Sequence, residues 1–268
     1  MKITIIGSGK MGCAMALGLM RAQPAGLEGL TMTNRTGNPP ATLKDLTDIR
    51  WTKDNREACR NADFIVLAVL PQQYEEVLSD VSAAAPDGAC LLSIAPGYSV
   101  ERLTSLTGGR FSVVRAMPNT PAMIGRGMIA VCENPAVPSR QFEEAVSILS
   151  VLGQTEIIQE SQLNAVIGIS GSAPAYLFVF LDALADAGVL GGLHRKQAVR
   201  MAVQTMLGAA ELAKETALSP AELRDMVCSP AGTTIEAVAA LEKNGLRSAV
   251  IEAARAAMEK ADRMGKKR

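Results

Sequence analysis

The sequence predicts an α/β fold in which a doubly wound parallel sheet is followed by an all-helical C-terminal domain. Over residues 1–158, short β-type runs alternate with helical windows, and the run 64–69 is apolar on both faces, as in a sheet covered by helices on each side. From about Leu163 the β-type alternation disappears, and Ala, Leu, Val and Met recur at helical spacing. We therefore expect a doubly wound α/β domain at residues 1–160 and a helical domain at residues 161–268.

The elements follow from these patterns in chain order. Strands are expected at residues 2–6, 30–33, 49–52, 64–69, 89–94, 111–115, 128–131 and 155–158. Helices between them are expected at residues 10–22, 55–61, 73–84, 100–106 and 140–149. In the second half, prolines and glycines predict helices at residues 174–187, 195–216, 220–227, 230–241 and 247–265.

Composition excludes several classes of protein. The chain has 268 residues, 27 basic and 27 acidic side chains, and 48% hydrophobic residues, which argues against a disordered chain and against an electrostatic nucleic-acid binder. Its five cysteines show no CxxC spacing, so we expect no disulfide framework and no metal site. The expected location is a reducing cytoplasm. The charge-free stretch 161–181 is interrupted by polar residues, so no membrane span is expected, and no export signal is visible.

A glycine-rich motif follows the first expected strand. It reads Gly7-Ser8-Gly9-Lys10-Met11-Gly12 and leads into an expected helix. In a GxGxxG turn the first glycine makes the bend, the second lets the backbone approach a pyrophosphate, and the third packs the helix on the strand. This context favours a Rossmann-type dinucleotide site, so residues 1–160 are expected to be a dinucleotide-binding domain; the alternative is a glycine-rich turn without a ligand.

The end of the second expected strand indicates which dinucleotide is bound. An acidic residue is typical there when the ribose carries a free 2′-hydroxyl, but the sequence reads Thr33-Asn34-Arg35-Thr36. Arg35 has the charge and the forked geometry to pair with the 2′-phosphate of NADPH. We expect NADPH, with NADH weaker; the alternative is that Arg35 is a solvated loop charge.

Three longer blocks make a family resemblance specific. They are Met117-Pro118-Asn119-Thr120-Pro121, Gly168-Ile169-Ser170-Gly171-Ser172-Ala173-Pro174-Ala175-Tyr176 and Ser229-Pro230-Ala231-Gly232-Thr233-Thr234. Together, and behind the glycine motif, they resemble the signature blocks of Δ1-pyrroline-5-carboxylate reductase, the last enzyme of proline biosynthesis. The similarity covers essentially the whole chain.

The resemblance implies an activity, an assembly and a substrate site. It implies hydride transfer from NADPH to the C=N carbon of 1-pyrroline-5-carboxylate, giving L-proline, in a homodimer that in this family often assembles further into a decamer. It implies that Thr234 is catalytic, with its hydroxyl near the substrate nitrogen. The implied substrate-binding residues are Asn119, Ser229, Ala231, Gly232, Thr233 and Thr234. His194, the only histidine, is expected at the surface.

The motif, the strand ends and the resemblance together give the expected cofactor-binding residues. In chain order they are Gly7, Ser8, Gly9, Lys10, Met11, Gly12, Asn34, Arg35, Asn55, Ala68, Val69, Leu70, Pro71, Ala95, Pro96 and Gly97.

At three positions the chain departs from the family pattern. Leu70 stands where the family usually has a lysine near the cofactor, and Ala173 and Ala231 each stand in place of a glycine. A methyl group added in a tight pocket changes discrimination by roughly 1–3 kcal/mol. Two alternatives therefore remain: a paralogous reductase for a related cyclic imino acid, and a non-catalytic nucleotide-binding protein.

Overall fold

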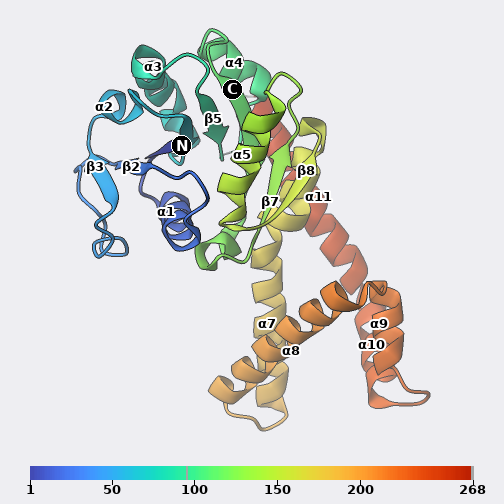
Figure 1. The fold of residues 1–268 in the computed structure, drawn as a ribbon. Coiled ribbons are helices and arrows are strands. Elements are labelled where there is room, and N and C mark those ends of the chain that lie inside the picture. Colours follow the sequence, from blue (N-terminus) through green and yellow to red (C-terminus); the bar gives the residue numbers. More distant parts are fainter. Residues whose placement is uncertain (95, 267–268) are drawn as a thin grey trace. The chain divides into compact units, whose positions relative to one another are not determined.

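Eight strands form one sheet in the part of the chain that the computed structural model describes, residues 1–94 and 96–266 (Figure 1). The strand order is β3-β2-β1-β4-β5-β6-β7-β8. The strands are β1 (Lys2–Ile6), β2 (Gly29–Thr33), β3 (Ile49–Thr52), β4 (Phe64–Leu67), β5 (Cys90–Ser93), β6 (Ser112–Met117), β7 (Gly127–Cys132) and β8 (Gly153–Ile158). The pairs among β1 to β6 are all parallel, which confirms the predicted doubly wound sheet.

The sheet changes direction once, at β7, and the sequence did not predict this. β7 pairs antiparallel with β6 and parallel with β8. A parallel crossover needs a dozen or more residues, usually a helix. Only a short 3₁₀ turn, η2 (Thr120–Ile124), fits between β6 and β7, so the chain returns beside the strand it has just left.

Helices cover both faces of the sheet and bury two separate cores. On one face α1 (Lys10–Ala22) and α5 (Ser139–Ser150) contribute Met15, Leu19 and Ile148, all fully buried. On the other face lie α2 (Asn55–Cys59), α3 (Tyr74–Ala84) and α4 (Val100–Leu106). Two covered faces explain why the strands are apolar on both sides.

The chain divides into two compact units. One is Met1–Gly171 with Ala257–Arg268, and the other is Ser172–Ala256. The second unit contains α7 (Ala173–Leu190), α8 (Arg195–Thr216), α9 (Pro220–Val227), α10 (Thr233–Lys243) and most of α11 (Leu246–Lys266). The prediction that a helix starts at Pro230 was wrong by three residues, because the chain first makes a turn in which Ala231 has φ 55°.

The helix entering the second unit is longer than its sequence suggested. The segments η3 (Glu160–Gln162), α6 (Leu163–Val166) and the π-helix η4 (Ile167–Gly171) continue into α7. The resulting helical stretch, Glu160–Leu190, is long and apolar enough to cross a membrane by length and composition. The expectation of no membrane span rested on the polar residues that interrupt the apolar run, and the helix continues through them. One such helix is weak support for a membrane span, because the core helix of a soluble protein passes the same test.

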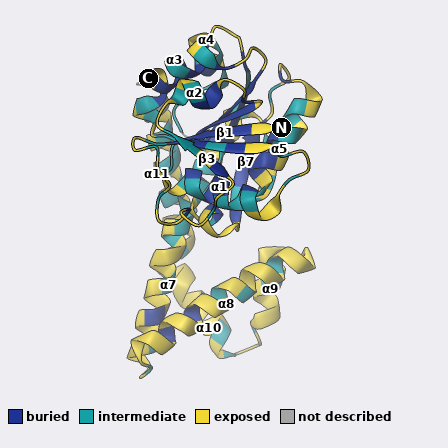
Figure 2. Cartoon of the chain, turned by 60° about the vertical axis from the view of Figure 1, so that its left-hand side comes forward, coloured by how far each residue is buried: buried dark blue, intermediate teal, exposed yellow. Residues whose placement is uncertain are grey.

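The helices of the second unit bury little of their apolar surface within one chain (Figure 2). In α7 to α10 the buried residues among those described are Ala185, Ala198 and Ala202. Phe178 is 62% exposed and Leu190 is 90% exposed. An apolar surface of this extent marks an interaction site.

Candidate functional site

The glycine-rich turn after β1 forms a cradle of backbone at the start of α1. Gly7 has φ +105°, and a Cβ there would lie 2.6 Å from the carbonyl oxygen of Ala68. A Cβ at Gly12 would lie 2.1 Å from the carbonyl oxygen of Gly7, so the third glycine lets α1 pack on the turn. A Cβ at Gly9 would meet no atom within 4 Å. The missing side chain at Gly9 is therefore not required for packing and leaves room for a ligand.

The amino end of α1 favours negative charge. Its N-cap, Gly9, makes no side-chain hydrogen bond, and the first turn holds no acidic residue. The first N–H groups of a helix have no partner within the helix and carry partial positive charge. Lys10 is exposed at this end and adds a full positive charge. These groups fit the pyrophosphate of a dinucleotide.

Asn34 ties the loop after β2 to the glycine-rich turn. Its Nδ2 donates hydrogen bonds to Ser8 Oγ at 3.0 Å and to the carbonyl oxygen of Asn38 at 2.7 Å. Its Oδ1 accepts from the backbone N–H of Gly37 at 2.7 Å. Both N–H groups of the amide are thus engaged within the chain. Asn34 consequently acts as the organiser of the loop that carries Arg35.

Asn55 is held in the same region by two neighbouring elements. Thr33 Oγ1 donates to Asn55 Oδ1 at 2.8 Å, and Asn55 Nδ2 donates to Asp80 Oδ2 at 3.2 Å. Arg56 Nε pairs with Asp80 Oδ1 at 2.9 Å and neutralises much of that carboxylate. The Asn55 amide keeps one N–H for a ligand.

These groups line one cavity of about 720 Å³ within the first unit. The predicted cofactor-binding residues that it brings together are Gly7, Ser8, Gly9, Lys10, Met11, Asn34, Arg35, Asn55, Ala68, Val69 and Leu70. Leu70 is 68% exposed, so an apolar side chain stands beside the cradle. The other predicted residues Gly12, Pro71, Pro96 and Gly97 do not line it, and Ala95 lies outside the described residues.

Sequence reasoning missed several residues that line this cavity. They include Lys53, Gln73, Glu76 and Asp80. For Lys53 a signal was available, because it follows the expected strand 49–52 directly and β3 is the neighbour of β2. For Glu76 and Asp80 on α3, and for Gln73 just before that helix, there was none, since which residues of this segment face the cavity depends on packing.

The turn before α10 belongs to the second unit. The N–H of Gly232 donates to the carbonyl oxygen of Ser229 at 3.0 Å and closes the turn. A Cβ at Gly232 would lie 2.3 Å from Ser229 Oγ, so glycine is required there. No side chain caps α10, which leaves the N–H groups of Thr233 and Thr234 without a capping partner. Uncapped N–H groups at a helix start suit a carboxylate.

Asn119 is engaged in structural hydrogen bonds within the first unit. Its Oδ1 accepts from the backbone N–H of Met128 at 3.0 Å, and its Nδ2 lies 3.3 Å from both the carbonyl oxygen and Oγ of Ser170. It therefore links the end of β6 to the start of β7 and to the π-helix. A contact to substrate remains a prediction.

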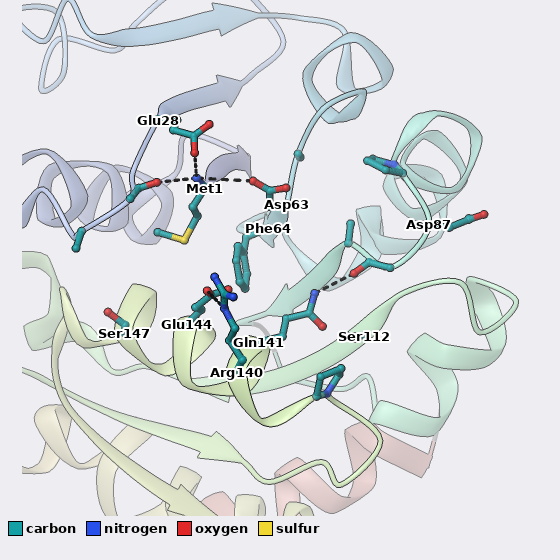
Figure 3. A pocket seen from close by; sticks show the side chains of 17 residues that line it. Met1, Glu28, Asp63, Phe64, Asp87, Ser112, Arg140, Gln141, Glu144 and Ser147 are labelled. Atoms are coloured by element: carbon teal, nitrogen blue, oxygen red, sulfur yellow. Dashed lines mark hydrogen bonds and ion pairs between the residues drawn. The ribbon is translucent and has the colours of Figure 1, made fainter.

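A second cavity, of about 850 Å³, lies among residues at the amino ends of β1, β4 and β5 (Figure 3). Its charged groups are paired within the chain. The terminal amine of Met1 pairs with Glu28 at 2.7 Å, and Arg140 Nε pairs with Glu144 at 3.1 Å. In open α/β sheets ligands bind outside the carboxyl ends of the strands, so we place the dinucleotide site at the cavity that holds the glycine cradle.

Burial makes three of the cysteine thiols poor nucleophiles. It raises the pKa of Cys59 and of Cys90 to about 12, and that of Cys132 to about 11. In the described part of the chain, no group of three or more His, Cys, Asp or Glu side chains is placed to hold a metal ion. The groups that line the cavity with the glycine cradle are backbone N–H groups, hydroxyls, amides, carboxylates and cations.

Comparisons with known proteins match both units. Residues 2–97 match the family described as NADP oxidoreductase, coenzyme F420-dependent, and residues 160–264 match the family described as pyrroline-5-carboxylate reductase dimerisation. Over 265 residues the chain is 39% identical to the pyrroline-5-carboxylate reductase of Escherichia coli (strain K12), covering 99% of this chain and 98% of that one. The chain belongs to the pyrroline-5-carboxylate reductase family. This confirms the resemblance predicted from the signature blocks.

Other members of the pyrroline-5-carboxylate reductase family extend the agreement. The enzyme of Synechocystis sp. is 40% identical over 266 residues, covering 99% of both chains. A structure from Coxiella burnetii has 34% identity and a TM-score of 0.89, covering 98% of this chain and 97% of that one. A Plasmodium falciparum structure with NADP bound has 32% identity and a TM-score of 0.84, covering 98% of both. The dimerisation match supports dimer formation by the second half of the chain.

Proposed function

We propose that the chain catalyses the NADPH-dependent reduction of 1-pyrroline-5-carboxylate to L-proline, the last step of proline biosynthesis. The observation that carries the proposal is full-length similarity to reductases of this name, together with a glycine cradle that fits a dinucleotide. NADPH is the cofactor, in keeping with the NADP oxidoreductase match and with the NADP-bound relative.

The residues have separate tasks in this proposal. Gly7, Gly9 and the start of α1 hold the pyrophosphate, and the loop after β2 binds the adenosine end through Arg35. Bound NADPH supplies the hydride for the C=N carbon. The start of α10 and the Ser229 hydroxyl hold the substrate carboxylate.

Thr234 is the proposed catalytic donor. Its hydroxyl donates a hydrogen bond to the ring nitrogen of the substrate as hydride addition to carbon gives that nitrogen a lone pair and removes its positive charge. A strong acid is not needed if the imine binds already protonated. That fits a chain whose only histidine, His194, is exposed at the start of α8.

The test is reduction of 1-pyrroline-5-carboxylate by the purified protein. We expect loss of NADPH absorbance together with formation of L-proline, and slower reaction with NADH. The six-membered imino acid is the matched control, because a paralogous reductase for a larger ring would turn it over faster. NADPH binding without turnover of either imino acid would favour a non-catalytic nucleotide-binding protein.

We further propose that residues 1–160 form the dinucleotide-binding domain and residues 161–268 the dimerisation and substrate domain of a cytoplasmic homodimer. Support comes from the dimerisation match over 160–264 and from the exposed apolar side chains of α7 and α8. Assembly of dimers into a decamer is proposed from the family alone. The balanced charge of the chain favours neither nucleic acid nor an anionic membrane surface as a partner.

A further inference from the structure

Two cations follow the neighbouring strands β2 and β3: Arg35 lies after β2 and Lys53 after β3. From the sequence alone, only Arg35 was predicted to bind the cofactor. We propose that Lys53 acts with Arg35 to bind the 2′-phosphate of NADPH, so that Lys53 is a second residue determining cofactor preference. This inference rests on the proposed function, since it assigns one part of the cofactor site.

The backbone holds the two positions side by side. β2 and β3 pair in parallel with Thr33 opposite Thr52, so the residues that follow them leave the sheet together. The N–H of Asn34 donates to the carbonyl oxygen of Thr52 at 3.4 Å. The loop then passes close to the backbone of Lys53. A Cβ added at Gly37 would lie 3.2 Å from the backbone nitrogen of Lys53.

Both cations line the cofactor cavity and lack an acidic partner. Within residues 1–94 and 96–266, neither Arg35 nor Lys53 forms an ion pair with another described side chain. Both are exposed in the cavity lining. Unpaired cations at an open site are available to an anionic ligand.

The neighbouring carboxylates are engaged elsewhere, with one exception. Asp54 caps α2 by accepting hydrogen bonds from the backbone N–H groups of Arg56 and Glu57, and Asp54 does not line the cavity. Asp80 pairs with Arg56 at 2.9 Å. The exception is Glu76, which lines the cavity from α3 and forms no ion pair with another described residue. Arg35, Lys53 and Lys10 outweigh it, and the cavity has a net attraction for phosphate.

A 2′-phosphate carries up to two negative charges, and one guanidinium compensates only part of them. Arg35 offers a planar fork and Lys53 a point charge with three N–H donors, so the two can bind different oxygens of one phosphate. NADH has a neutral hydroxyl at that position and gains nothing from a second cation. Lys53 therefore affects the choice between NADPH and NADH more than it affects binding of the pyrophosphate, which both cofactors contain.

The experiment measures binding and does not depend on turnover. Isothermal titration calorimetry on the full chain compares NADP⁺, NAD⁺ and 2′,5′-adenosine diphosphate for the wild type, Lys53→Ala, Lys53→Arg and Arg35→Ala. Lys44→Ala is the matched control, because Lys44 is exposed and does not line the cavity. We expect Lys53→Ala to weaken NADP⁺ and 2′,5′-adenosine diphosphate about threefold to tenfold and to leave NAD⁺ unchanged.

The other variants and the salt dependence complete the test. Lys53→Arg should retain most of the affinity for NADP⁺, and the loss in Lys53→Ala should shrink at high ionic strength. Equal weakening of NADP⁺ and NAD⁺ in Lys53→Ala, or no change in either, would overturn the proposal. A wild type that discriminates NADP⁺ from NAD⁺ but does not reduce 1-pyrroline-5-carboxylate would refute the proposed function and leave this test of Lys53 intact.

Discussion

Replacing Asn34 by Asp should turn the cofactor preference from NADPH toward NADH. Asn34 is the residue directly after β2, where an acidic side chain binds the ribose 2′-hydroxyl in NAD-dependent proteins. The carboxylate keeps the acceptor for the N–H of Gly37, and Ser8 Oγ can rotate to donate to it, so the loop retains most of its contacts. Only the bond to the exposed carbonyl oxygen of Asn38 is lost outright.

The size of the change follows from two contributions. A carboxylate about 4 Å from the 2′-phosphate disfavours NADPH by about 1–2 kcal/mol, because at an exposed site with a dielectric near that of water each phosphate charge contributes about 1 kcal/mol of repulsion. A hydrogen bond from the ribose hydroxyl to a charged acceptor favours NADH by about 1.5 kcal/mol. Together they amount to about 3 kcal/mol, or about two orders of magnitude in the ratio of dissociation constants.

Titration calorimetry with NADP⁺ and NAD⁺ measures this ratio directly. Asn34→Ala is the control, because it removes the donors and the acceptor together and should weaken both cofactors through disorder of the Arg35 loop. If Asn34→Asp weakens NADP⁺ and NAD⁺ by the same factor, the residue does not lie beside the ribose and the placement of the adenosine end is wrong.

Four further predictions concern other parts of the chain. Thr234→Ala should lower turnover about 30-fold to 1000-fold with NADPH affinity nearly unchanged, because one transition-state donor is worth roughly 2–4 kcal/mol. Thr234→Ser should keep most activity. Steady-state kinetics measures the turnover, and calorimetry measures the affinity for NADPH. Ala231→Gly should raise the free energy of unfolding by about 1 kcal/mol in a denaturant titration, because φ 55° disfavours a side chain; a decrease would contradict the assigned turn. Leu70→Lys should tighten NADP⁺ binding in calorimetry by adding a cation to the cavity lining, and unchanged affinity would mean that position 70 does not reach the phosphates. Light scattering at low micromolar concentration should give a dimer formed through residues 163–268, and a stable, active monomer would refute that interface.

The fold could be predicted where local patterns are strong. The strands Lys2–Ile6 and Ile49–Thr52 and the helix Lys10–Ala22 lie where the sequence placed them, because apolar runs and the glycine motif define both ends. The direction of β7 was missed, since it depends on the length of a connection between elements and not on the strand itself. The helix after Pro230 was placed too early. A proline is common in the first turn of a helix, but Pro230 lies in the turn before α10, which begins at Thr233.

The cavity-lining residues that closely follow an expected strand could be predicted from the sequence. The glycine cradle and Arg35 are readable because sequence-adjacent residues form them. Asp80 could not be found, since it reaches the cavity from α3 and its partner Asn55 lies 25 positions earlier in the chain. Lys53 is intermediate: its place after a strand was visible, and its closeness to Arg35 required the strand order.

The most direct test of the proposed activity follows the transferred hydrogen. The protein is incubated with 1-pyrroline-5-carboxylate and NADPH that carries deuterium at the transferable position, and the product is examined by mass spectrometry. The account predicts L-proline with a single deuterium on the ring carbon that was double-bonded to nitrogen. Unlabelled proline, or oxidation of NADPH without proline, would contradict it.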